Sequence, residues 1–436
     1  MRVSILVLAI ACGARTDLEV ERSPLVDAAV DAALDAPGFD ARPDPPDCGD
    51  SVPVGQVRAS VDAIHARVAI GDDDNLYTAR RVDDAWLAVS LDPCLEERWA
   101  TPVALGDRTP RGMDVSVADD GTVWLIGQSG LDQWAFSSDG DPRPGLIPMG
   151  ERRRDTWIGL GANGPIYSVF LTTEEKWLVV TDGDRFEDLR LPTPSSFVWD
   201  GECAVFADAP TCWNIGFRFD PLDRAWLEGR PRLIDGTLRN IVPPAFDGRR
   251  MWSIEYGIST YELVAVDVRD GDRVIREPLM RTSSGQTELL LGSPVIAEDG
   301  SVILYRHGSG VPGALEKRSS SGELEWTASA PRVRRGTPAG GAIFSNEALH
   351  LVGRGGLVYL AVGASVYALE LRDGSLVWRI DGLTDLNESA INLHRNGDLY
   401  VLDRGETLHA IVTASAGLAP SPWPIPGGNA RLSLSR

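Results

Sequence analysis

The sequence has few basic residues for its length and almost no lysine. Of 436 residues, 42 are Lys or Arg and 63 are Asp or Glu, which gives a formal net charge of −21. Only Lys176 and Lys317 are lysines, a bias that we interpret as codon usage in a GC-rich genome. A surface this acidic repels phosphate backbones, so nucleic acid is not expected as a partner.

Long apolar runs and helical periodicity are also lacking. Beyond residue 11 no apolar segment approaches the ~20 residues that a membrane-spanning helix needs. No long run places apolar residues at i, i+3, i+4 and i+7, the spacing of an amphipathic helix. Hydrophobic residues still make up 43% of the chain, as in folded proteins. These features exclude a wholly disordered chain and favour an all-β protein.

The motifs of common enzymes and metal sites are missing as well. The sequence contains no Gly-x-Ser-x-Gly elbow, no Walker loop and no His-Glu-x-x-His pattern. No Cys-x2–4-Cys pair is present, and the five histidines lack ligand spacing. The run from Asp72 to Asn75 could offer oxygens to calcium, but we interpret it as a solvated hairpin turn. We therefore predict no metal and no cofactor, and the sequence nominates no catalytic residue.

The first 47 residues are predicted to be a targeting segment followed by a tether. In residues 1–11, Arg2 precedes a short apolar run, as in a signal peptide. Cys12 follows Ala11, and this ending resembles the lipobox of bacterial lipoproteins, although Ala9 stands where Leu is usual. An ordinary cleaved signal peptide is the alternative. Residues 12–47 are rich in Asp, Ala and Pro and cannot bury enough apolar surface to fold, so we expect a disordered tether. The expected location is the outer membrane of a bacterial envelope, on its periplasmic or surface side.

Four cysteines remain beyond Cys12, an even number that suits an exported protein. Cys203 and Cys212 flank a short loop, and a short loop is the least costly to close. We therefore expect these two to form a disulfide. Cys48 would then pair with Cys94 and fix the end of the tether to the first folded unit, although three pairings are possible in principle.

A unit recurs from about residue 49 onward, at intervals of about 40 to 55 residues. It consists of an apolar strand, a turn rich in Gly, Asp or Asn, and a second strand that opens with an apolar or aromatic pair. The pairs are Leu76-Tyr77, Val123-Trp124, Ile166-Tyr167, Met251-Trp252, Val302-Ile303, Val358-Tyr359 and Leu399-Tyr400, with an eighth unit at 205–213. This spacing is typical of propeller blades. It predicts an eight-bladed β-propeller of four-stranded antiparallel blades over residues 48–436.

Two or three units carry a more specific motif. Ala368, Glu370, Asp373, Gly374 and Trp378 match the Ala-x-Asp-x-x-Thr-Gly-x-x-x-Trp docking pattern of quinoprotein-type propellers. The same spacing recurs, with Ile in place of Trp, at Ala265, Asp267, Asp270, Gly271 and Ile275, and a partial copy ends at Trp326. The chain thus resembles pyrroloquinoline-quinone-like β-propeller lipoproteins across about residues 60–424.

The resemblance implies a specific role for each end of the motif. The glycine turns the third strand of a blade into the fourth, and the large aromatic packs between neighbouring blades. The segment 421–435 contains Trp423 between prolines and resembles the tails or heads that close such rings.

Two functions remain compatible with this fold. The first is a non-catalytic, lipid-anchored monomer that binds a protein partner on a propeller face, as an envelope or surface scaffold. The second is an exported quinoprotein-type oxidoreductase or carbohydrate-active enzyme that uses the central funnel. The quinoprotein dehydrogenases of the family hold their quinone beside a vicinal disulfide, and no two cysteines are adjacent here. No Cys-x-x-Cys-His haem site exists for electron exit either. We favour the scaffold over the enzyme.

The lipobox-like ending leads to a first testable prediction. Cys12→Ser removes the thiol that would carry the lipid, so this variant should leave the membrane fraction and appear among the soluble proteins. Membrane fractionation together with the mass of the mature N-terminal peptide measures this. An unlipidated mature mass with unchanged membrane association would contradict the prediction.

Overall fold

The protein is described from a computed structural model, and the chain separates into two units, Met1–Pro43 and Asp44–Arg436. The described residues belong to the second unit and are 48 and 52–425. The gaps are 106–112, 119, 128–132, 144–153, 161–165, 172–175, 183–184, 191–202, 207–208, 213–216, 221–224, 228–238, 241–244, 257–259, 268–272, 282–288, 309–310, 331–349, 385, 387–389, 405 and 422–423. Between 154 and 240 only the backbone is described. The predicted signal peptide, lipidated Cys12, the whole of the tether, motif residues Asp270 and Gly271, and Trp423 therefore lie outside the described residues.

Every regular element of the described residues is a β-strand, and the strands form eight antiparallel sheets, here called blades. Blade 1 contains β2 (Ala69–Ile70), β3 (Leu76–Val82), β4 (Ala85–Leu91) and β5 (Glu97–Pro102). Blade 2 contains β6 (Met113–Val117), β7 (Val123–Gly127), β8 (Gln133–Phe136) and β9 (Pro142–Arg143). Blade 3 contains β10 (Arg154–Leu160), β11 (Ile166–Leu171), β12 (Lys176–Asp182) and β13 (Arg185–Arg190). Blade 4 contains β14 (Cys203–Phe206), β15 (Ala209–Cys212), β16 (Phe217–Asp220) and β17 (Ala225–Leu227).

The second half of the chain supplies the other four blades. Blade 5 contains β18 (Arg239–Asn240), β19 (Ala245–Phe246), β20 (Arg250–Tyr256), β21 (Thr260–Asp267) and β22 (Arg273–Arg281). Blade 6 contains β23 (Leu289–Leu291), β24 (Val295–Ile296), β25 (Val302–Gly308), β26 (Val311–Arg318) and β27 (Leu324–Ala330). Blade 7 contains β28 (His350–Gly353), β29 (Leu357–Val362), β30 (Ser365–Glu370) and β31 (Leu376–Asp381). Blade 8 contains β32 (Ala390–Leu393), β33 (Asp398–Leu402), β34 (Leu408–Val412) and β1 (Val57–Val61).

The repeat read from the sequence coincides with these blades. Each apolar or aromatic pair lies within the first three residues of the strand that follows the blade's innermost strand or strands, as Leu76-Tyr77 does in β3 and Leu399-Tyr400 does in β33. The eighth unit, at 205–213, overlaps β14 and β15. The predicted all-β propeller of four-stranded antiparallel sheets is thereby confirmed. Blades 5 and 6 differ from it in a fifth, two- or three-residue strand.

The turn between the first and second strands has the same construction in several blades. In blade 6, Gly300 has a φ of 75° and its amide donates to the carbonyl of Ala297 over 3.0 Å. The carboxylate of Asp299 accepts a hydrogen bond from the amide of Ser301 over 2.9 Å. In blade 1 the same turn has Asp74, with a φ of 63°, in the glycine position. The run Asp72–Asn75 is therefore a hairpin turn, as interpreted from the sequence.

The buried apolar residues lie between neighbouring blades, because each sheet packs its face on the next. One cluster joins Tyr359 of blade 7 to Ile391 and Leu399 of blade 8. Another joins Leu76 of blade 1 to Tyr400 and Leu408 of blade 8. First strands of adjacent blades also contact each other, as β28 does with β24 and β32. In the described part of the chain, no helix is long and apolar enough to cross a membrane.

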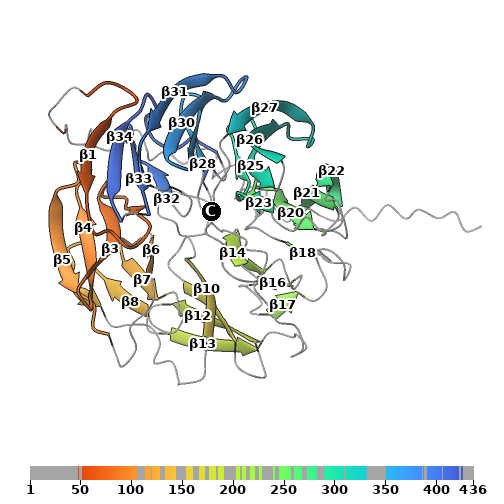
Figure 1. The fold of residues 1–436 in the computed structure, drawn as a ribbon. Coiled ribbons are helices and arrows are strands. Elements are labelled where there is room, and N and C mark those ends of the chain that lie inside the picture. The colour runs from red at the N-terminus through yellow and green to blue at the C-terminus, as the bar shows by residue number, and fades with distance from the viewer. Residues whose placement is uncertain are drawn as a thin grey trace, which may run out of the picture. The chain divides into compact units, whose positions relative to one another are not determined.

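The ring is closed by the N-terminal strand β1, which pairs antiparallel with β34 from Val57↔Ile411 to Val61↔Leu408. Figure 1 shows β1 beside the blue β34, although the two come from opposite ends of the chain. The sequence pattern suggests instead that segment 421–435 closes the ring, and this is corrected. The described part of that tail contacts blades 6 and 7: Pro424 accepts a hydrogen bond from Val352 over 2.8 Å, and Ser421 Oγ donates to the carbonyl of Ile296.

The two predicted disulfides have different outcomes. Cys48 and Cys94 are joined by a disulfide, with their Cα atoms 5.4 Å apart. Cys203 and Cys212 are register partners on β14 and β15. Such partners lie ~4.5–5.5 Å apart in antiparallel sheets, a separation that a disulfide can bridge. The Cys203–Cys212 bond itself stays a prediction.

The first strand of blade 7 leads to a prediction about acid stability. His350 is fully buried, its Nε2 lies 3.2 Å from the carbonyl oxygen of Ile303, and burial lowers its pKa from 6.5 to about 4. Below pH 6.5 the imidazole of His350 takes up a proton in the unfolded chain but stays neutral in the folded chain. The free energy of unfolding therefore falls as the pH drops toward 4. At ~1.36 kcal/mol per pKa unit, the loss is about 3 kcal/mol.

Urea unfolding at pH 7.0 and pH 4.5 measures this loss. His350→Gln cannot titrate, so the difference in unfolding free energy between the two pH values should be smaller than in the wild type. An equal difference in both proteins would show that His350 does not control acid stability.

Candidate functional site

The blades are locked together by a large side chain of one blade packed on a glycine of the next. Trp326 lies in β27, the last strand of blade 6, and its indole N–H donates to the carbonyl of Leu371 in blade 7 over 2.8 Å. Gly374 in the same turn has a φ of +72°, and a Cβ there would lie 2.8 Å from the Trp326 ring. Only a residue without a side chain allows this approach.

The same contact recurs around the ring. A Cβ on Gly140 would lie 2.7 Å from the Trp99 ring, and a Cβ on Gly322 would lie 2.7 Å from Ile275. Trp378 packs in the same way on Gly55, which precedes β1, so the contact also spans the junction of the two chain ends. The motif thus works between repeats: each Trp or Ile meets the glycine of the following blade.

The acidic residues of the motif do not share one role. Asp267 is buried, and one of its carboxylate oxygens accepts a hydrogen bond from Arg249 Nε over 2.9 Å. Asp373 is exposed and accepts a hydrogen bond from the amide of Ser375 over 3.0 Å. The backbone carbonyl of Glu370 accepts the amide of Gly374 over 2.8 Å. Ala368 is fully buried opposite Trp378. Glu370 and Asp373 thus shape the turn between strands three and four of blade 7, whereas Asp267 pairs with Arg249.

A row of exposed apolar residues follows these turns. Leu324 and Leu376 come two residues after Gly322 and Gly374, and their side chains are 53% and 57% exposed. Val57, two residues after Gly55, is 37% exposed. Val377 and Val274 are also exposed in the last strands of blades 7 and 5. We call these five residues the apolar row.

A repeated irregularity in strand pairing explains why the row is exposed. The register shifts between Lys317↔Trp326 and Arg318↔Leu324, and it shifts at the equivalent point in blades 1, 5, 7 and 8. A β-bulge changes the direction of the side chains beside it. In the Gly-x-Leu-x-Trp sequence of blades 6 and 7, the Trp is therefore the inward contact and the Leu stays in solvent. Sequence reasoning singles out the Gly and the Trp but misses the leucine between them.

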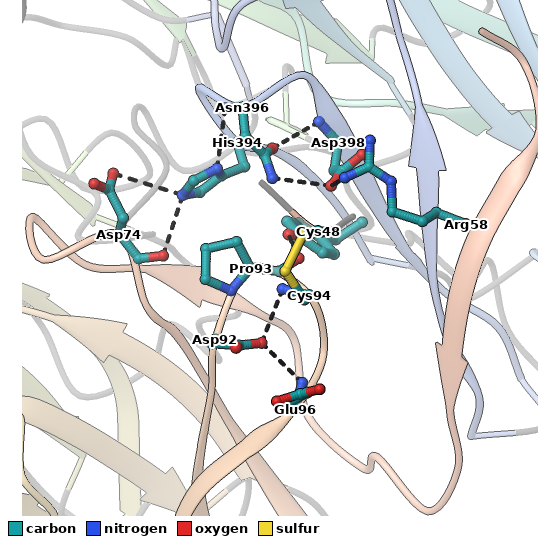
Figure 2. The surroundings of a disulfide bond; sticks show 11 residues. Cys48, Arg58, Asp74, Asp92, Pro93, Cys94, Glu96, His394, Asn396 and Asp398 are labelled. Atoms are coloured by element: carbon teal, nitrogen blue, oxygen red, sulfur yellow. Dashed lines mark hydrogen bonds and ion pairs between the residues drawn. A yellow bond between two sulfur atoms is a disulfide. The ribbon is translucent and has the colours of Figure 1, made fainter. Parts of the chain in front are cut away.

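The ring closes where β1 pairs with β34 to complete blade 8 and where blade 8 meets blade 1. We call this region the closing seam, and it contains the disulfide (Figure 2). Cys94 lies in the turn between β4 and β5, and the carboxylate of Asp92 caps this turn by accepting the amides of Cys94 and Glu96, each over 2.8 Å. The hydroxyl of Tyr400, in blade 8, donates to the carbonyl of Pro93 over 2.5 Å. The cysteine turn of blade 1 is thus fastened both to blade 8 and to Cys48.

Charged and polar groups hold the same side of the closing seam. Figure 2 shows His394 of blade 8 beside Asp74 of blade 1, with 3.1 Å between His394 Nε2 and the Asp74 carbonyl oxygen. Arg395 forms an ion pair with the Asp74 carboxylate. Burial lowers the pKa of His394 and raises the pKa of Asp398. Asp398 pairs with Arg58 of β1 over 3.2 Å.

A second set of contacts connects residues of the closing strand and its flanks to blade 8. His65 Nε2 lies 2.8 Å from a carboxylate oxygen of Glu406. Thr407 donates its hydroxyl to the carboxylate of Asp62 over 2.8 Å, and Ser60 Oγ lies 2.8 Å from His409 Nδ1. Three of the five histidines of the chain are therefore used at this one seam.

Among the described residues, the disulfide and the docking tryptophans do not match the quinone site that the family resemblance implies. The disulfide joins residues 46 positions apart, so it cannot serve as the vicinal disulfide of the dehydrogenases. Trp99, Trp326 and Trp378 are occupied in contacts between blades. Among the described residues, no group of three or more His, Cys, Asp or Glu side chains could hold a metal ion.

Comparison with known proteins supports the propeller fold and its repeat. Residues 223–379 match the family model described as outer membrane protein assembly factor BamB, of the PQQ-like type. This confirms the resemblance to quinoprotein-type propellers predicted from the docking motif. No curated protein matches the chain.

Several solved structures match the chain at low sequence identity. The Dos1 propeller has a TM-score of 0.52 and 9% identity, covering 84% of this chain and 97% of that chain. BamB from Moraxella catarrhalis has a TM-score of 0.36 and 15% identity, covering 82% and 94%. Virginiamycin B lyase from Staphylococcus aureus has a TM-score of 0.43 and 10% identity, covering 81% and 98%. The likeness to the Dos1 propeller shows the fold alone.

The docking contact leads to a prediction that separates steric fit from backbone strain. Gly374→Ala places a methyl group against the Trp326 ring at a positive φ, so it should lower the unfolding free energy by about 2–4 kcal/mol. Gly355 also has a positive φ, but a Cβ added there would have nothing within 4 Å. Gly355→Ala should therefore cost only the strain, about 1–2 kcal/mol.

Denaturant unfolding of both variants measures the difference. If both variants lose the same unfolding free energy, the Trp326 ring moves aside without cost and the docking contact does not depend on the glycine.

Proposed function

We propose that the protein is a non-catalytic scaffold of the bacterial envelope, lipid-anchored through Cys12 and monomeric, whose propeller binds another protein. The observation that carries this proposal is the apolar row. Large apolar side chains on soluble proteins mark interaction sites when they recur together on one surface. Here Leu324, Leu376 and Val57 each lie two residues after a docking glycine in blades 6, 7 and 8, and Val274 and Val377 each lie three residues after the motif glycine in blades 5 and 7.

The chemistry around the row indicates the kind of partner. Leu324 stands between Glu323 and Glu325, and the Leu376–Val377 pair is followed by Arg379, so apolar anchors alternate with charges of both signs. Protein interfaces have this composition, with an apolar centre and a polar rim. A uniformly charged ligand would not match it. The expected partner is an envelope protein that inserts apolar side chains between these charged residues.

The family match supports the same role. The matching family is named for outer membrane protein assembly, an activity that depends on contacts between proteins. A lipid on Cys12 and a flexible segment up to residue 47 would give the propeller a wide reach from the membrane. In this proposal the acidic charge of the chain keeps the tethered domain soluble while the apolar row selects the partner.

Photo-crosslinking in the native envelope tests the proposal. A photoreactive amino acid at Leu324 or Leu376 should give one dominant protein adduct, whereas the same amino acid at Val82 should not. Val82 is the matched control, because it is an apolar residue 47% exposed outside the row. The adduct identifies the partner, which is then purified for binding measurements.

Substitutions then establish whether the row carries the affinity. Leu324→Asp with Leu376→Asp should weaken binding of the purified partner at least ~10-fold, since each buries a charge in the interface. Val82→Asp should leave it unchanged. Adducts of equal strength from both sites and from the Val82 control, or none, would contradict the proposed surface. Stoichiometric quinone binding with alcohol-dependent dye reduction would replace the scaffold with an oxidoreductase.

A further inference from the structure

The strand that closes the ring is held more weakly at its docking contact than its counterparts. Trp326 and Trp99 each donate an indole hydrogen bond to the next blade, over 2.8 and 2.9 Å. Trp378 packs on Gly55 before β1, but its Nε1 is buried with no hydrogen-bond partner among the described residues. β1 thus depends on its pairing with β34 and on side-chain contacts such as Arg58–Asp398.

The Cys48–Cys94 disulfide lies where it can keep a pulling force on the N-terminal segment from reaching β1. Cys48 precedes β1 in the chain, and Cys94 lies in the turn after β4 of blade 1. β1 is therefore inside the covalent loop that the disulfide closes. A pull on the chain before Cys48 passes through the two sulfur atoms into blade 1 and does not reach β1.

The same pull has a different path when the disulfide is open. It then reaches Gly55 and Val57 first, at the end of β1 where the pairing with β34 begins. Force on the end of a strand breaks its hydrogen bonds one after another rather than together. The pairs from Val57↔Ile411 to Val61↔Leu408 would separate in sequence, and the ring would open at blade 8.

We propose that Cys48–Cys94 is a force-bearing latch, which carries tension from the N-terminal segment into blade 1 and keeps the ring closed. Its reduction switches the latch off. A dithiol donates two electrons and two protons, the Sγ–Sγ bond breaks into two thiols, and the dithiol becomes a disulfide. The proposal rests on the proposed membrane tether only for the source of tension. The Tyr400–Pro93 contact adds to the latch, because it ties the cysteine turn to blade 8.

Single-molecule force spectroscopy on the mature chain tests the latch, with Cys12→Ser to keep it free of lipid and handles at both ends. In the oxidised protein the residues between Cys48 and Cys94 stay hidden during complete unfolding. In Cys48→Ser/Cys94→Ser, these 46 positions should add about 160 Å, at ~3.4 Å per residue. This variant should also show an early rupture at lower force than any rupture of the wild type.

Three comparisons make the test specific. Arg58→Gln should lower the early rupture force further in the variant, yet leave the first rupture of the oxidised wild type unchanged. The control variant Cys203→Ser/Cys212→Ser lacks a different pair of cysteines and keeps Cys48–Cys94. It should show no early rupture until a dithiol reduces Cys48–Cys94. An identical first rupture in the wild type and Cys48→Ser/Cys94→Ser would overturn the latch. Because the handles replace the membrane, this outcome is independent of lipidation and of any partner.

Discussion

The contact of a large side chain with a glycine of the next blade is the constraint on which the rest of this structure depends. It sets how closely two blades approach, since a methyl group at Gly374 or Gly322 would meet the neighbouring ring or isoleucine below 3 Å. The same turns direct the last strand outward and place Leu324 and Leu376 in solvent. One short sequence, Gly-x-Leu-x-Trp, therefore provides both an internal lock and an external surface. Under the proposed function, stability and recognition are coupled at the level of single turns.

Much of this fold can be predicted from short stretches of sequence. The apolar-aromatic pairs and the Gly or Asp turns predict strands and hairpins because their signals lie within a few residues of one another. The docking motif predicts that Trp378 lies between blades, and it does. Its partner could not be predicted, because Gly55 is far away in the sequence and lacks the rest of the motif around it. The pairing of β1 with β34 is missed for the same reason, because nothing in the sequence of Val57–Val61 indicates a partner strand some 350 residues away.

The exposure of the apolar row could not be predicted, and here the reason is local rather than distant. Leu324 and Leu376 read as ordinary strand residues, because an alternating apolar pattern predicts that one face of a strand is buried. Their exposure follows from two facts outside that pattern, namely the shift in register before Trp326 and Trp378 and their place in a last strand. An apolar residue at the second position after a docking glycine is the signal that would have found them. The closing seam could be anticipated only through its cysteines, since its histidine and carboxylate contacts join opposite ends of the chain.

A closed ring has no free end to fray, but a chain must join itself somewhere, and here the join pairs β1 with β34 from the other end of the chain. In this protein the join collects the Cys48–Cys94 disulfide, the Arg58–Asp398 pair, and histidines that meet carboxylates on both blades. The other blades are each built from one continuous stretch of chain, and the docking residues Trp326 and Trp99 each complete their contact with an indole hydrogen bond. Trp378, which docks blade 7 on the segment before β1, makes no such bond to a described residue, and side-chain cross-links hold β1 to the rest of blade 8 and to blade 1. Their concentration at the segment that leads to the N-terminus is what the proposed attachment through that end would require.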